Sequence, residues 1–113
     1  MPARKPQQLK VREKDIQRGI LHYLAMKGIL AHKHRSVGIF KKATGSYIPL
    51  PLQDRGISDI IGCLHGGRFF AIEVKAPGNK PTPEQANYLA KVTKAGGLAI
   101  LAYSLEDVIK AGI

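Results

Sequence analysis

The chain has 113 residues, 44% of them hydrophobic, and one cysteine, which predicts a single domain that folds in a reducing compartment without disulfide bonds. Eighteen Lys and Arg stand against eight Asp and Glu, and the resulting net charge of +10 indicates a polyanionic partner. No apolar run reaches the ~18 residues that a membrane span needs, and no signal peptide is evident, so we expect a soluble cytoplasmic protein.

The N-terminal part of the chain predicts a flexible arm followed by a helix. Residues 1–11 contain prolines and basic side chains but no apolar periodicity, which is typical of a solvated basic arm. From residue 12 to residue 27 apolar side chains recur at helical spacing, and Gly28 follows where a glycine ends many helices. This helix should open a single domain over residues 12–113.

The next stretch is less regular. Residues 29–37 alternate loosely between apolar and polar side chains and predict a half-buried strand. Residues 38–57 carry several glycines and prolines and show no clean period, so we expect a long connection with short strand fragments near Phe40 and over 47–50. Connections of this length in small domains are usually functional or disordered.

The central and C-terminal parts have clearer signals. Two β-prone runs, 58–64 and 68–76, are separated by a His-Gly-Gly turn and predict an antiparallel hairpin. Thr82 and the proline after it predict a helix over residues 83–94, which two glycines follow. A short buried strand over 98–103 and a last helix over 105–110, capped by a serine, complete the predicted order αβββαβα.

Two of the few acids lie in the predicted hairpin. Asp59 and Glu73 are equally far from the turn, so the antiparallel pairing should place them opposite each other. Glu73 and Lys75 are two residues apart and should share a face of the strand, whereas Ile72 and Val74 should point to the opposite face. Two carboxylates and one amine should therefore converge on a small patch.

Such a patch predicts a metal site. Adjacent carboxylates repel each other unless a proton or a cation lies between them. Oxygen ligands favour Mg²⁺ or Mn²⁺, and the backbone carbonyl of Val74 is an additional candidate ligand. An ion at this place could polarise a phosphoryl oxygen and activate a water molecule, while Lys75 orients the water and neutralises charge in the transition state.

An Asp on one strand and Glu-x-Lys on the next resemble the PD-(D/E)XK nuclease superfamily. The segments RGISDIIG (Arg55–Gly62), AIEVKAPGNKPTPEQ (Ala71–Gln85) and AGGLAILAYSLEDV (Ala95–Val108) are similar to its VRR-NUC group, and the similarity extends over the chain from Glu13 onward. The resemblance implies an α/β fold with a restriction-endonuclease-like core, in which helices flank a mixed central sheet. Ser58 stands where the superfamily name has a proline.

The resemblance also implies roles for single residues. Asp59 and Glu73 would bind the metal, and Lys75 would be the catalytic lysine. Gln85 matches a glutamine of the site, and Glu13 matches an acid on the first helix that can complete the metal site. The residues themselves leave other interpretations open: Gln85 as a solvent-facing helix residue, Glu13 as a first-turn acid favoured by the helix dipole, and Lys75 as a partner in a structural ion pair.

Short members of this group resemble phage-type homodimeric enzymes that act on branched DNA. We therefore expect a structure-selective DNA endonuclease, similar to a Holliday-junction resolvase, in the cytoplasm of a bacterial or phage-infected cell. A restriction-like or nicking nuclease that reads sequence is one alternative. A non-catalytic, basic nucleic-acid-binding protein is the other.

Several cations are candidates for contacts to the nucleic-acid backbone, although an ordinary solvated face would use the same residues. His32 and His34 could face the same side of a strand, but without a third ligand we expect DNA contact or partial burial instead of metal binding. Cys63 has no base beside it and is expected to be inert. The predicted nucleic-acid-binding residues are Lys33, Arg35, Lys41, Lys42, Arg55, Lys80, Arg4 and Lys5.

Overall fold

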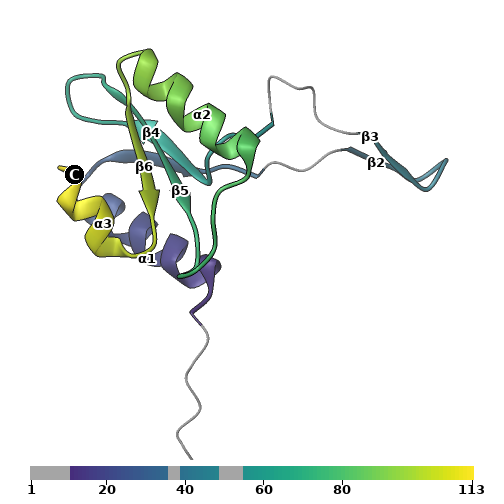
Figure 1. The fold of residues 1–113 in the computed structure, drawn as a ribbon, viewed down its shortest axis with the longest axis horizontal. Helices are drawn as coiled ribbons and strands as arrows, with labels where there is room; N and C mark the ends of the chain where they lie inside the picture. Colours follow the sequence, from purple (N-terminus) through teal and green to yellow (C-terminus); the bar gives the residue numbers. More distant parts are fainter. Residues whose placement is uncertain (1–10, 36–38, 49–54) are drawn as a thin grey trace, which may run out of the picture.

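The computed structural model describes residues 11–35, 39–48 and 55–113 (Figure 1). The expected arm over 1–11, with Arg4 and Lys5, lies outside these residues except for Val11. The elements in chain order are α1 (Glu13–Met26), β1 (Leu30–Lys33), β2 (Ile39–Lys41), β3 (Ser46–Ile48), β4 (Ile60–Cys63), β5 (Phe69–Val74), α2 (Pro83–Lys94), β6 (Leu98–Ala102) and α3 (Leu105–Lys110).

Four strands form one mixed sheet in the order β1-β4-β5-β6. The β1–β4 and β4–β5 pairs are antiparallel, and the β5–β6 pair is parallel. The parallel pair requires a crossover, and α2 provides it between β5 and β6. The mixed α/β sheet flanked by helices is the predicted fold class.

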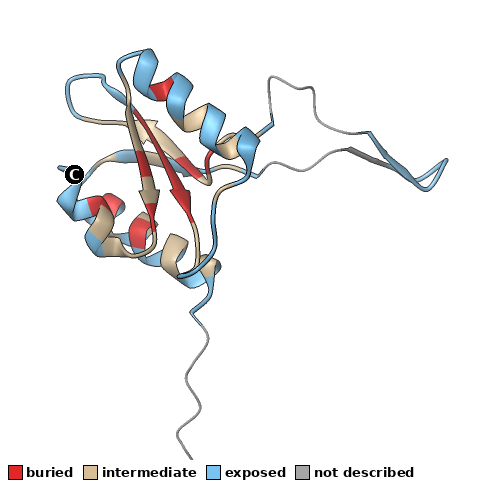
Figure 2. Cartoon of the chain, viewed as in Figure 1, coloured by how far each residue is buried: buried red, intermediate tan, exposed pale blue. Residues whose placement is uncertain are grey.

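The helices lie on both faces of this sheet. The main core lies between the sheet and the pair α1 and α3, which contribute Ile20, Leu24 and Val108 (Figure 2). α2 lies on the other face, where it packs on β5 and β6 (Figure 1). β5 has a helix on each side, so its residues from Phe70 to Val74 are all buried. None of the helices in the described ranges is long and apolar enough to cross a membrane.

The segment between β1 and β4 forms a separate two-stranded hairpin. β2 and β3 pair antiparallel, with Phe40 opposite Tyr47, and Figure 1 shows the hairpin standing apart from the four-stranded sheet. The expected strand fragments are therefore confirmed near both residues. The rest of the expected fragment, residues 49 and 50, lies outside the described residues. The structure adds the pairing, which the irregular sequence of 38–57 did not indicate.

Local signals set the helix boundaries well and the strand boundaries less well. α2 and α3 begin and end where the sequence predicted: Thr82 and Ser104 cap their first turns through their side chains, and Gly96 and Gly112 follow their last turns. The strands are shorter than predicted: the β1 ladder ends at Lys33, and the β4–β5 ladder ends at the pair Ile60–Ile72. Asp59 and Lys75 thus lie just beyond strand ends, where side chains are free to form a site.

Candidate active site

The register of β4 and β5 brings the two predicted carboxylates together. Ile60 pairs with Ile72, so one further step of the same register places Asp59 opposite Glu73. The Val74 N–H donates a hydrogen bond of 2.8 Å to Asp59 Oδ2, which fixes this carboxylate against the end of β5. The predicted cross-strand proximity is confirmed.

The predicted alternation along β5 is also confirmed. Lys75 Nζ lies 3.9 Å from Glu73 Oε1, so the two side chains share one face. Ile72 and Val74 point to the opposite face and belong to the main core. The Lys75 side chain is 13% exposed and that of Glu73 only 1%, so the amine reaches the surface and the carboxyl group lies beneath it.

Glu73 is held in an environment that disfavours its charge. The pKa of Glu73 is raised to about 8: burial is the largest cause, the negative charge of Asp59 also raises the pKa, and the positive charge of Lys75 lowers it. Glu73 Oε2 is buried and has no hydrogen-bond partner among the described residues. A buried carboxylate oxygen without a partner is costly in a folded protein, and a bound cation would satisfy it. The donor set of this site fits a hard divalent cation.

The backbone of Val74 contributes to the same place. The N–H and C=O of one strand residue point to the same side of the strand, and the Val74 N–H points to Asp59. The Val74 carbonyl is therefore expected on the same side of β5 as its N–H. Its role as an additional oxygen ligand stays a prediction.

Glu13 lies at the start of α1 and contacts the loop that follows β5. Its Oε1 accepts hydrogen bonds from the Ala76 N–H, at 3.2 Å, and from Asn79 Nδ2, at 3.3 Å. Over residues 11–35, 39–48 and 55–113, no group of three or more His, Cys, Asp or Glu side chains is arranged to hold a metal ion. The structure thus shows Glu13 binding the loop directly after Lys75, and its role as a metal ligand stays a prediction.

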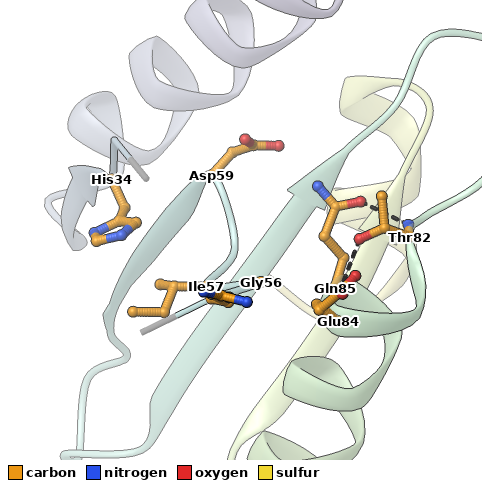
Figure 3. Close-up of a pocket in the computed structure, with 8 residues that line it drawn as sticks. His34, Gly56, Ile57, Asp59, Thr82, Glu84 and Gln85 are labelled. Carbon is orange, nitrogen blue, oxygen red and sulfur yellow. Dashed lines mark hydrogen bonds between the residues drawn. The ribbon is translucent and has the colours of Figure 1, made fainter. Parts of the chain in front are cut away.

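Gln85 has a structural role that the sequence interpretation missed. The side-chain Oε1 of Gln85 accepts a hydrogen bond from the Thr82 backbone N–H at 2.8 Å. The backbone N–H of Gln85 donates to Thr82 Oγ1 at 3.2 Å, and the two bonds form a capping box at the start of α2. In Figure 3 the amide nitrogen of Gln85 lies on the side facing Asp59. Gln85 therefore links the first turn of α2 to the candidate site.

A pocket of about 400 Å³ adjoins Asp59 (Figure 3). His34 belongs to its wall because β1 continues alongside β4: the His34 N–H donates to the Asp59 carbonyl at 2.7 Å. The sequence interpretation considered His34 only with His32 and did not place it beside Asp59. The β1–β4 register, a non-local feature, was the missing signal. The pocket is lined by His34, Arg55, Gly56, Ile57, Asp59, Thr82, Glu84 and Gln85.

Of the remaining candidates within the described ranges, only Arg55 lines the pocket. Cys63 is half-buried and its thiol donates to the Leu64 carbonyl, and its inertness stays a prediction. The predicted cations that the structure describes are all exposed, which a contact with nucleic acid requires. These are Lys33, Arg35, Lys41, Lys42, Arg55 and Lys80.

Comparisons with known proteins identify the fold. No protein-family model matches the sequence, and no curated protein matches it. Among solved structures, one described as "VRR_NUC domain" is 22% identical, with a TM-score of 0.59, over 87% of this chain and 90% of the other. A second, described as "VRR_NUC domain protein", is 21% identical, with a TM-score of 0.65, over 91% and 86%. The chain therefore has the fold of VRR_NUC domains, which is a PD-(D/E)XK-like fold.

Proposed function

We propose that the protein is a divalent-metal-dependent DNA endonuclease. The observation that carries the proposal is the arrangement of Asp59, Glu73 and Lys75 around a buried carboxylate oxygen that has no partner among the described residues. The VRR_NUC fold of the similar structures supports a nuclease, and the net charge of +10 supports a nucleic-acid substrate.

In this proposal each group at the end of β5 has a defined task. The carboxylates of Asp59 and Glu73 and the Val74 carbonyl hold Mg²⁺ or Mn²⁺. The bound ion supplies Lewis-acid stabilisation of the phosphodiester and lowers the pKa of a water molecule. The hydrogen bond from the Val74 N–H keeps Asp59 oriented before the substrate arrives.

Lys75 acts at the surface of the site. Its ammonium group is the positive charge of the trio, and its side chain is 13% exposed, so it can reach a substrate phosphate, whereas the Glu73 side chain is buried. The lysine orients the attacking water and offsets the negative charge that develops on the phosphorane-like transition state. The exposed cations elsewhere on the chain bind the flanking nucleic-acid backbone.

Two variants test the assignment of this site. Asp59→Ala removes a metal ligand and Lys75→Ala removes the charge that stabilises the transition state, so each should lower Mg²⁺-dependent cleavage by about 100-fold or more. DNA binding, measured by fluorescence anisotropy, should change little. Asp15→Ala, which removes an exposed carboxylate on α1, is the matched control and should cleave at the wild-type rate. Normal turnover by either site variant would show that its residue is wrongly assigned.

A further inference from the structure

The pocket beside Asp59 has the size and the chemistry of a ligand site. Its volume of about 400 Å³ lies within the range of roughly 300–1,000 Å³ that small-molecule sites occupy. Three separate parts of the chain form it: the end of β1, the loop before β4 and the first turn of α2. Figure 3 shows His34 and Ile57 on one side and Gln85 on the other, with Asp59 between them.

Of the three charged side chains that line the pocket in the described part of the chain, two are acidic (Asp59 and Glu84) and one is basic (Arg55), which disfavours a phosphate as its occupant. Asp59 and Glu84 both line it, and a phosphate group would meet two carboxylates there. A neutral nucleobase would instead find complementary groups: a carboxylate can accept from an exocyclic amino group, and the Gln85 amide nitrogen can donate to a ring nitrogen or a carbonyl. The Gln85 oxygen is already bound to the Thr82 N–H, so this amide can present only its donor side.

Two further residues are suited to pack against the flat face of a base. Ile57 is half-buried in the wall and provides an apolar surface. The exposed Arg55 carries a planar guanidinium, which stacks on aromatic rings and is used in this way by proteins that bind unpaired nucleotides.

The wall that carries these residues is fixed. Gly56 has a φ of 77°, and a side-chain carbon at this position would lie 2.3 Å from the Glu84 carbonyl oxygen. The loop before β4 therefore lies directly on the first turn of α2, and the capping box holds that turn in place. The pocket is thus formed before a ligand arrives, which reduces the entropic cost of binding.

We propose that this pocket binds the unpaired base of a nucleotide next to the cleaved phosphodiester. The inference rests on the proposed nuclease function and names the feature of the substrate that the site recognises. A base inside a duplex is stacked and paired and cannot enter a pocket without being extruded, which costs free energy. A branch point interrupts the continuous stack of a duplex, so extrusion of a base should cost less there, which gives a physical reason for preferring branched over linear DNA.

The test uses a four-way junction with a single 2-aminopurine, scanned through the nucleotides on either side of the mapped cut. Binding is measured in EDTA, so that the readout does not depend on cleavage. At one position the wild-type protein should increase the fluorescence, because the base leaves the stack. An abasic nucleotide at that position should weaken binding about ten-fold.

Variants connect this effect to the pocket. In Arg55→Ala and Ile57→Ala the fluorescence increase should shrink, and the abasic substitution should no longer weaken binding, because the partner of the base is already lost. Lys94→Ala, at the far end of α2, removes one exposed positive charge and is the matched control for Arg55→Ala. It should retain the full fluorescence response and the full abasic effect.

The outcomes separate the two proposals. If no position brightens, or if the abasic junction binds as tightly as the intact one, the base-binding pocket is wrong even when the enzyme cleaves DNA. If Arg55→Ala loses affinity equally for intact and abasic junctions, Arg55 contacts the backbone and the pocket proposal is again contradicted. Failure to cleave any DNA in Mg²⁺ would contradict the nuclease function instead.

Discussion

Glu73 combines two properties that a stable domain normally avoids. It is a nearly fully buried carboxyl group, and one of its oxygens has no hydrogen-bond partner within the described part of the chain. Burial of such a group disfavours ionisation, which explains why its pKa is raised to about 8. A residue with these properties destabilises the fold unless a ligand compensates, so its presence at this place is an argument for function.

The raised pKa of Glu73 predicts a pH dependence of stability. Between pH 4.5 and about 8 the folded protein keeps a proton on Glu73 that the unfolded chain releases. The free energy of unfolding should therefore be highest below this window and fall as the pH rises through it, by up to about 1.4 kcal/mol per pH unit. Urea unfolding at a series of pH values, without divalent metal, measures the slope.

Glu73→Gln is the control for this prediction. The amide cannot ionise, so the slope in this window should disappear while the fold is retained. Mg²⁺ binds the ionised form, so its addition should stabilise the wild-type protein more at pH 8 than at pH 5, and should have little effect on Glu73→Gln. Superimposable pH profiles for the two proteins would contradict the assignment of the titration to Glu73.

At the scale of residues, the sequence predicted what depends on local counting. The proximity of Asp59, Glu73 and Lys75 could be predicted from their distances in sequence to one turn and from the two-residue period of a strand. The structure brings all three side chains together. His34 was not predicted beside Asp59, because its place depends on how β1 pairs with β4 across a long connection. The contact of Glu13 with the loop after β5 is equally non-local.

At the scale of elements, α2 links the fold to the site. It is the crossover between β5 and β6, and its first turn forms one wall of the pocket. The capping box that starts the helix uses Gln85, so a single side chain closes the helix end with its oxygen and presents its nitrogen towards Asp59. Substitutions at this position should separate the two roles.

Gln85→Glu keeps an oxygen that can accept the Thr82 N–H but lacks the amide donor, whereas Gln85→Ala lacks both. We expect the alanine variant to lose about 0.5–1 kcal/mol of unfolding free energy and the glutamate variant to lose little. Both should bind and cleave branched DNA more weakly than the wild type. Urea unfolding and cleavage rates, measured on the same preparations, would separate the capping role of Gln85 from its role in the site. A glutamate variant with wild-type cleavage would leave Gln85 with the capping role alone.

The elements also show where sequence patterns succeed and fail. α2 and α3 could be bounded from the sequence because Thr82 and Ser104 hydrogen-bond to backbone groups only a few residues away. The strand ends could not be predicted from the sequence, because a strand ends where the neighbouring strand of the sheet diverges from it. The β2–β3 hairpin was seen only as fragments, since its short strands have no apolar period of their own.

At the scale of the whole molecule, a strongly basic chain contains a small acidic site. The chain carries +10 overall, yet Asp59 and Glu73 lie together at the end of the sheet. The cations attract the DNA backbone over a distance set by the salt concentration, and the metal would reverse the sign of the acidic site at close range. The part of the chain that the structure describes holds one such site, so two symmetric cuts in one junction would require two chains.

This requirement predicts a homodimer with two independent sites. On a supercoiled plasmid with an extruded cruciform, the wild-type dimer should cut both strands within one encounter and yield linear DNA. Dimers formed by mixing wild-type protein with an excess of Asp59→Ala should yield nicked circles instead, because only one site is active. Analytical ultracentrifugation should show the dimer at the concentrations used. A monomer, or linear product from the mixture at the wild-type rate, would contradict the two-chain account.

We propose that Asp59, Glu73 and Lys75 form a metal-dependent site that cleaves branched DNA. The decisive experiment is a cleavage assay over a matched panel of four-way junctions, splayed duplexes and linear duplexes, each with Mg²⁺ and with EDTA. We expect cuts near the branch points in Mg²⁺, weaker cleavage of the linear duplex, and no product in EDTA. Equal cleavage of branched and linear DNA would contradict structure selectivity. Binding without any product in Mg²⁺ or Mn²⁺ would contradict the nuclease itself and favour a non-catalytic nucleic-acid-binding protein.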